Sequence, residues 1–170
     1  MKTRTIEPEP AISVEYVINE LRHRGNSRAA AGMSRFGIHT GAALGFANRK
    51  AYEWSERKEE YVKRAGFVLM AEMAVHDKNA SDKTFLDFLP TIVREASDER
   101  NFVKKAVNWA LRQIGKRNAN LNTAAIKTCA DIEDAGSRAG KWIAAGALRE
   151  LTSAPVKKRL ASKKSTRPKR

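Results

Sequence analysis

Four side chains of contrasting chemistry recur at helical spacing in the middle of the chain. Lys105, Trp109, Arg112 and Lys116 stand four, three and four residues apart, and at about 100° per residue they share one side of a helix. An indole set between cations suits an anion that carries flat apolar groups, which describes nucleic acid. Alternatively, a neighbouring helix covers the indole and the basic stems lie across it. This helix alone supports both interpretations equally.

The helix that must position these side chains is predicted over residues 97–118. Ser97 or Asp98 can cap its first turn, Glu99 suits the positive end of the helix dipole, and basic residues suit the last turn. The side opposite the cations is apolar. Four residues within roughly 60° of arc predict the core face: Val103, Val107, Ala110 and Ile114.

The flanking sequence predicts further helices and no sheet. Gly (10) and Pro (5) are infrequent, and no sustained two-residue alternation is present. Pro90 is predicted to kink or break a helix that Ser81 caps. The other predicted helices cover 14–25, 28–35, 46–57 and 58–76, then Asn120 or Asn122 to Gly136, and 137–154.

Two pairs of segments match each other at regular offsets. Residues 61–65 align with 102–106, which lie 41 positions later, and residues 110–114 align with 147–151, which lie 37 positions later. Such periods are typical of stacked helix pairs of HEAT or armadillo type. The predicted fold class is therefore all-α, a short α-solenoid of stacked helix pairs.

The repeat also predicts a shared cationic surface. Arg64 matches Lys105, Arg112 matches Arg149, and Trp142 falls level with Lys105. Equivalent helices of a solenoid face the same side, so these residues would form one groove that holds a phosphate backbone by charge. The predicted DNA-binding residues are Arg64, Lys105, Trp109, Arg112, Lys116, Trp142 and Arg149. Two further cations, Lys63 and Lys104, are expected to be merely solvated.

The charge balance indicates a polyanionic partner. The formal net charge is +14, and residues 156–170 contribute eight basic and no acidic side chains, which leaves +6 for the remainder. Nucleic acid is favoured over an anionic membrane, and the longest apolar stretch, 65–75, is too short to span a bilayer. We expect a disordered lead-in at 1–12, one domain at 13–155 and a disordered basic tail at 156–170.

The single cysteine bears on the compartment. Cys129 cannot form an internal disulfide, and no metal cluster can be assembled around it. Residues 1–10 lack the apolar core of a signal peptide. The prediction is a cytoplasmic protein with no metal ligand and no cofactor.

The segment 98–118 closely resembles the DNA alkylation repair family of HEAT-like alkylpurine DNA glycosylases. Segments 60–65, 74–78 and 147–152 resemble it as well. The resemblance implies a partner, duplex DNA that carries cationic alkylated purines such as 3-methyladenine and 7-methylguanine, and an activity, hydrolysis of their N-glycosidic bonds. It also implies that Trp109 and Arg112 lie at the lesion and that Arg64 contacts DNA.

The resemblance is interrupted between Gly45 and Phe46. Family members carry on the order of 80 further residues there, about two helical repeats, and these include the Asp-rich motif with the catalytic Asp. No segment of this sequence replaces them. We therefore identify no catalytic residue and expect DNA binding to survive better than base excision. The exposed edge is expected to favour self-association or a rearranged amino-terminal helix pair.

Two alternatives stay open. Glycosylase activity could persist through another carboxylate, although no spacing places one beside Trp109. The carboxylates considered are Glu53, Glu59, Glu60 and Glu150. The other alternative is a non-catalytic scaffold that binds an acidic protein or RNA through its repeat surface.

Overall fold

The structure is a computed structural model that describes the backbone of residues 41–165 and the side chains of residues 47–162. Several predictions from the sequence lie outside these residues. They are the lead-in at 1–12, the helices at 14–25 and 28–35, the rearranged amino-terminal pair, and the end of the basic tail.

Residues 41–165 are helical and contain no strand, which confirms the all-α prediction. The elements, in order, are α3 (Gly41–Ser55), α4 (Glu60–His76), α5 (Asp82–Leu86), α6 (Leu89–Glu95), α7 (Asn101–Gly115), α8 (Ala119–Asp134), α9 (Arg138–Leu151) and α10 (Ala154–Ser165). The helix predicted to kink or break at Pro90 is divided into α5 and α6. Pro90 lies in the first turn of α6, where a backbone N–H would have no partner within the helix. No helix in this range is long and apolar enough to cross a bilayer.

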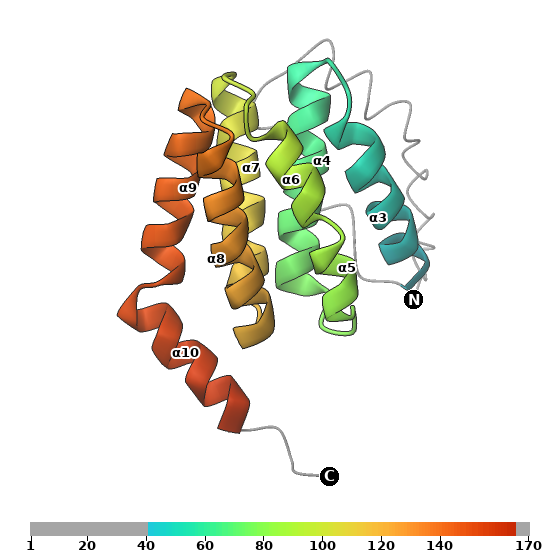
Figure 1. Cartoon of the computed structure of the whole chain (residues 1–170). Coiled ribbons are helices and arrows are strands. Elements are labelled where there is room, and N and C mark those ends of the chain that lie inside the picture. The colour runs from blue at the N-terminus through green and yellow to red at the C-terminus, as the bar shows by residue number, and fades with distance from the viewer. Residues whose placement is uncertain (1–40, 166–170) are drawn as a thin grey trace, which may run out of the picture.

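The helices stack as pairs in two layers (Figure 1). Helix α7 packs between α4 and α9 in one layer, while α3, α5 with α6, and α8 form the other. Among the described residues, the hydrogen bonds between helices distant in sequence connect positions 29 to 43 apart. That separation is about one repeat, so the structure confirms the predicted short α-solenoid of stacked pairs.

The core lies between the layers and α7 contributes its predicted apolar side. Val103, Val107, Ala110 and Ile114 are completely buried, as their spacing predicts. Helices α3 and α4 approach closely at Gly66, where a Cβ atom would stand 2.4 Å from a backbone nitrogen of α3. Only the absence of a side chain permits this contact.

The start of α7 differs from the prediction. The helix begins at Asn101 with Arg100 as its cap residue, not at Ser97 or Asp98. The Asp98 carboxylate instead accepts a hydrogen bond of 3.0 Å from the Arg100 backbone N–H, and the Arg100 guanidinium donates to the same carboxylate. Asp98 is thereby engaged in a turn before the helix.

Two other polar residues near helix starts are used differently than expected. Glu99 accepts a hydrogen bond of 2.9 Å from the Ala139 backbone N–H, in the first turn of α9. Asn118, not Asn120 or Asn122, caps α8 by accepting from the Leu121 N–H. In each case a first-turn N–H that has no partner within its helix donates to a nearby side-chain oxygen.

The beginning of the basic tail is ordered as helix α10, in contrast to the predicted disorder from residue 156. Val156 and Leu160 lie one helical turn apart and are both buried, and α10 packs on α8 and α9. Arg159 Nη2 also donates a hydrogen bond of 2.7 Å to the Lys116 carbonyl. Apolar burial at two positions orders a segment whose composition is otherwise strongly basic.

Candidate nucleic-acid interface

A groove of about 540 Å³ lies between α7 and α9. Three of the seven predicted DNA-binding residues line it: Arg112, Trp142 and Arg149. Asn108, Gly146 and Glu150 line it as well. Three residues that the repeat alignment placed on one surface, from α7 and α9, therefore line the same groove.

The groove exists because α7 and α9 are held at a fixed spacing. Asn108 is buried, and its side-chain amide donates a hydrogen bond of 2.9 Å to the Ile143 carbonyl of α9. Gly146 faces this amide, and a Cβ atom there would stand 3.2 Å from the Asn108 nitrogen. Asn108 was not predicted as a site residue, because it falls beside the polar stripe of α7 and no sequence signal distinguishes it from a solvated amide.

Glu150 is the acidic residue of the groove and binds two of the predicted cations. Lys116 Nζ donates a hydrogen bond of 2.6 Å to Glu150 Oε1, and the Arg112 guanidinium forms an ion pair with Oε2. Arg112 Nη1 also donates to Asn108 Oδ1 at 3.3 Å, while Arg112 Nε is buried without a hydrogen-bond partner. The two cations of α7 are thus oriented by one carboxylate of α9.

The environment of Glu150 keeps it ionised. Burial alone would raise the pKa of the Glu150 carboxyl, but the hydrogen bond from Lys116 and the charges of Lys116 and Arg112 outweigh it and lower the pKa below its ordinary value. This partnership was not predicted from the sequence. Separations of 34 and 38 residues, close to the repeat period of 37, are the signal that could have revealed it.

An exposed aromatic face borders the groove. Trp142 is 47% exposed, and Lys104 Nζ lies 5.6 Å from the centroid of its ring, within the range of a cation–π contact. Lys104 was expected to be merely solvated, but the structure places it against the Trp142 indole. Lys105 on α7 and Arg149 on α9 are exposed.

Trp109 and Arg64 lie differently from the groove residues. Trp109 is partly buried and packs against the hydrophobic core, as the helix-covered interpretation predicted. Arg64 is half-buried on α4, where its guanidinium carbon lies 5.6 Å from the centre of the Phe102 ring. Burial lowers the pKa of Arg64, and its Nη1 is buried without a hydrogen-bond partner. The structure thus places Arg64 on the α4 side of α7, away from the α9 groove.

Lys63 belongs to a buried polar cluster and not to a solvated surface, which corrects the expectation from sequence. Its Nζ donates a hydrogen bond of 2.5 Å to Glu95 and lies 3.5 Å from Asp98. Burial would raise the pKa of both carboxyls, but hydrogen bonds from neighbouring cations outweigh it and lower both pKa values. The Lys63 side chain is only 12% exposed, so it has little surface to offer a ligand.

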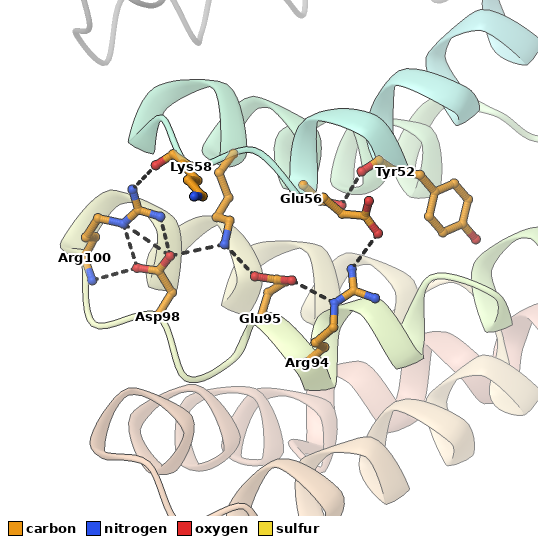
Figure 2. Close-up of polar contacts among 9 residues, drawn as sticks. Tyr52, Glu56, Lys58, Arg94, Glu95, Asp98 and Arg100 are labelled. Carbon is orange, nitrogen blue, oxygen red and sulfur yellow. Dashed lines mark hydrogen bonds and ion pairs between the residues drawn. The ribbon is translucent and has the colours of Figure 1, made fainter.

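The same cluster continues to both sides (Figure 2). Arg94 donates to Glu95 at 2.8 Å and to Glu56, directly after α3, at 2.9 Å. Arg100 donates to the Asp98 carboxylate and, at 2.6 Å, to the Lys58 carbonyl. These contacts join α3, the start of α4, and the segment from α6 to α7, which indicates a structural role.

Two of the four carboxylates considered from sequence are engaged away from the groove, and a third, Glu60, begins α4. Glu53 pairs with Lys50 on α3 at 2.5 Å, and Glu59 pairs with Arg57 at 2.8 Å. Glu150 is the acidic residue that lines the α7–α9 groove. Among the side chains described, no group of three or more His, Cys, Asp or Glu residues is placed to hold a metal ion.

Comparison with known proteins gives one family match. The family described as DNA alkylation repair enzyme matches residues 46–151. The matched segment contains both helices of the groove and begins at Phe46, directly after the interruption noted in the sequence. No curated protein and no solved structure matches the chain.

Proposed function

Because the chain belongs to the DNA alkylation repair enzyme family, we propose that it binds duplex DNA without sequence preference through the α7–α9 groove. The exposed Trp142 between Lys104 and the groove cations is the observation that carries this proposal. Cations hold a phosphate backbone through charge, and an exposed indole can stack on a sugar or a base. The cytoplasm is the proposed compartment.

We further propose that excision of alkylated purines, with 3-methyladenine and 7-methylguanine as the candidate bases, is impaired. Helix α3 runs without a break across Gly45 and Phe46, where the resemblance places the family's catalytic Asp segment. The family match itself starts on the far side of that position. This support concerns the absence of the family's Asp segment and leaves the α7–α9 groove intact.

A second candidate function is a glycosylase that uses Glu150. Loss of an alkylated purine leaves positive charge on the deoxyribose, and an ionised carboxylate beside the sugar would stabilise it. Glu150 lies in the groove and its pKa is lowered. However, Lys116 and Arg112 both contact this carboxylate, and their charges oppose stabilisation of a cation. The geometry therefore favours binding over catalysis.

Release of 7-methylguanine from methylated duplex DNA separates the two candidates. We expect release at the level of a no-protein control, together with DNA binding that weakens steeply with salt. Release well above this background that falls in Glu150→Gln would establish the glycosylase. Lys127→Gln, which removes an exposed charge on α8, is the matched control. Equal affinity for RNA or for an acidic polypeptide would favour a scaffold instead.

Self-association through the edge next to the interruption stays a prediction. Light scattering of the full chain at high concentration checks it. A strictly monomeric species would count against it.

A further inference from the structure

A second groove, of about 780 Å³, lies at the end of the stack where α4 and α7 stop and α8 begins. Its lining contains four cationic side chains and one carboxylate, that of Asp82. The cations are Lys78, Lys116, Arg117 and Arg159. The function proposed above does not use this groove.

Arg117 lines the second groove, and hydrogen bonds hold its guanidinium in place. Its guanidinium donates hydrogen bonds of 3.1 Å to the carbonyls of Ala74 and Ala80, and it lies 4.3 Å from the centre of the Phe85 ring. Burial lowers its pKa, but the pKa of an arginine stays far above neutral pH. Arg117 therefore supplies a charge whose position is set by the fold.

Lys78 and Arg159 present charge that the fold does not neutralise. Lys78 Nζ donates to the Val75 carbonyl, and Arg159 Nη2 donates to the Lys116 carbonyl at 2.7 Å. Both side chains are exposed, and neither forms an ion pair with a carboxylate within residues 47–162. Their positive charge is thus available to an anionic ligand.

Asp82 offsets one of the four positive charges. Its two oxygens accept hydrogen bonds from the neutral amides of Asn118 at 2.6 Å and Asn120 at 2.9 Å. The carboxylate is therefore held at the start of α8 by neutral donors. Because Lys116 pairs with Glu150 and Asp82 acts on Arg117, the net positive charge of the groove comes mainly from Lys78 and Arg159.

Helix α10 extends the positive surface away from the stack (Figure 1). Lys157 and Lys158 are exposed on it, and residues 154–165 contain no acidic side chain. Lys116 lines the second groove and also contacts Glu150 of the first. The two grooves therefore adjoin at Lys116, while α10 lies outside the residues that match the family.

We propose that the second groove and α10 bind the phosphate backbone of the same duplex that occupies the α7–α9 groove. The inference rests on the proposed DNA binding and extends the DNA footprint beyond α7 onto α10. Recognition here is by charge alone, because no exposed aromatic ring lines the second groove among its described residues. This segment therefore contributes affinity without sequence preference.

The test compares the salt dependence of duplex DNA binding in the full chain and four variants, of which Arg149→Gln alters the first groove. Lys78→Gln and Arg159→Gln each remove one charge from the second groove, and Lys127→Gln removes one from the exposed face of α8. We expect each groove variant to lower affinity at least threefold at 0.1 M salt. Each should also flatten the slope of log affinity against log salt by about 0.9, the contribution of one phosphate contact.

The controls keep this inference separate from the proposed function. Lys127→Gln should leave the slope unchanged, and thermal melting checks that each variant is folded. Groove variants that match Lys127→Gln, while Arg149→Gln still weakens binding, would overturn the second contact and leave the first groove standing. A wild-type chain that binds no duplex DNA would overturn both proposals.

Discussion

Lys116 at the end of α7 donates a hydrogen bond of 2.6 Å to Glu150 at the end of α9. The same carboxylate also pairs with Arg112, so one acidic group occupies the two cations that a phosphate would otherwise contact. A DNA phosphate must displace this carboxylate or share its partners. We therefore expect Glu150 to oppose the proposed DNA binding while it orients the cations.

The first prediction concerns this competition. Glu150→Gln should strengthen duplex DNA binding about three- to tenfold at 0.1 M salt, because Lys116 and Arg112 become available to phosphates. The slope of log affinity against log salt should steepen by about 1 to 2. Fluorescence anisotropy of a labelled duplex across a salt series measures both quantities.

A matched control removes the same charge elsewhere. Glu133→Gln changes an exposed residue of α8 and should raise affinity only slightly through net charge. Equal gains in the two variants would show that Glu150 acts through net charge and not by holding the groove cations.

Trp142 should report and support DNA binding. Trp142→Ala should weaken binding about tenfold, since stacking on an aromatic contributes about 1–3 kcal/mol per base. Trp142→Phe, which keeps an aromatic face, should retain most of the affinity. DNA should quench the fluorescence of the wild-type chain more than that of Trp142→Phe. Unchanged affinity in Trp142→Ala would remove the indole from the interface.

The cluster around Glu95 and Asp98 should make the fold acid-sensitive. Both carboxyls have pKa values lowered by folding, so their stabilising contribution is present above about pH 4.5 and disappears as pH falls through the folded pKa. Glu95→Gln and Asp98→Asn should each cost about 1–3 kcal/mol at pH 7. Each should also flatten the loss of thermal stability between pH 5 and pH 3.

The control for this prediction is an exposed ion pair. Asp87 pairs with Lys83 within one helical turn, and both side chains are largely solvated. Asp87→Asn should change the free energy of unfolding by less than about 0.5 kcal/mol. An equal cost in both places would contradict a special role for the buried cluster.

Gly66→Ala should destabilise the contact between α3 and α4. Helix propensity alone would favour Ala by about 1 kcal/mol, but the new Cβ would lie 2.4 Å from the Ser55 nitrogen and 2.9 Å from the Ala51 carbonyl. Backbone cannot give way as a side chain can, so a net loss of about 2 kcal/mol is expected in chemical denaturation. Gly146→Ala, which meets the Asn108 side chain at 3.2 Å, should cost less.

Cys129 should be unreactive in the folded chain. Burial raises the pKa of its thiol to about 11, so the thiolate fraction at pH 8 is on the order of 10² lower than in an ordinary cysteine. A colorimetric disulfide reagent should therefore react at least that much more slowly with the folded chain than with the chain in guanidinium chloride. Rapid reaction without denaturant would contradict the buried position.

The helices and their stacking could be predicted because the relevant signals are local or periodic. The apolar stripe from Val103 to Ile114 fixes the core face of α7, and the offsets of 37 and 41 residues match the separations that the long-range hydrogen bonds show. Pattern and period determine which sides of neighbouring helices meet.

The roles of single polar residues could not be predicted, because they depend on how helices rotate against one another. The sequence around Asn108 and Lys63 suggests that both side chains face solvent. Each instead forms a hydrogen bond with a residue about 35 positions away. The order of α10 depends on Val156 and Leu160, two apolar residues within a basic segment. Composition averages over such pairs, whereas packing depends on them.

The long-range hydrogen bonds of the described residues join positions 29 to 43 apart in sequence. This short range has a consequence for folding. A chain whose long-range contacts span about one repeat closes only short loops, and the entropy of loop closure stays small. Folding can then nucleate in one helix pair and spread to its neighbours. Because α7 has helices on both sides and α10 packs at the end of the stack, mainly on α8 and α9, amide hydrogens should exchange last in α7 and first in α10.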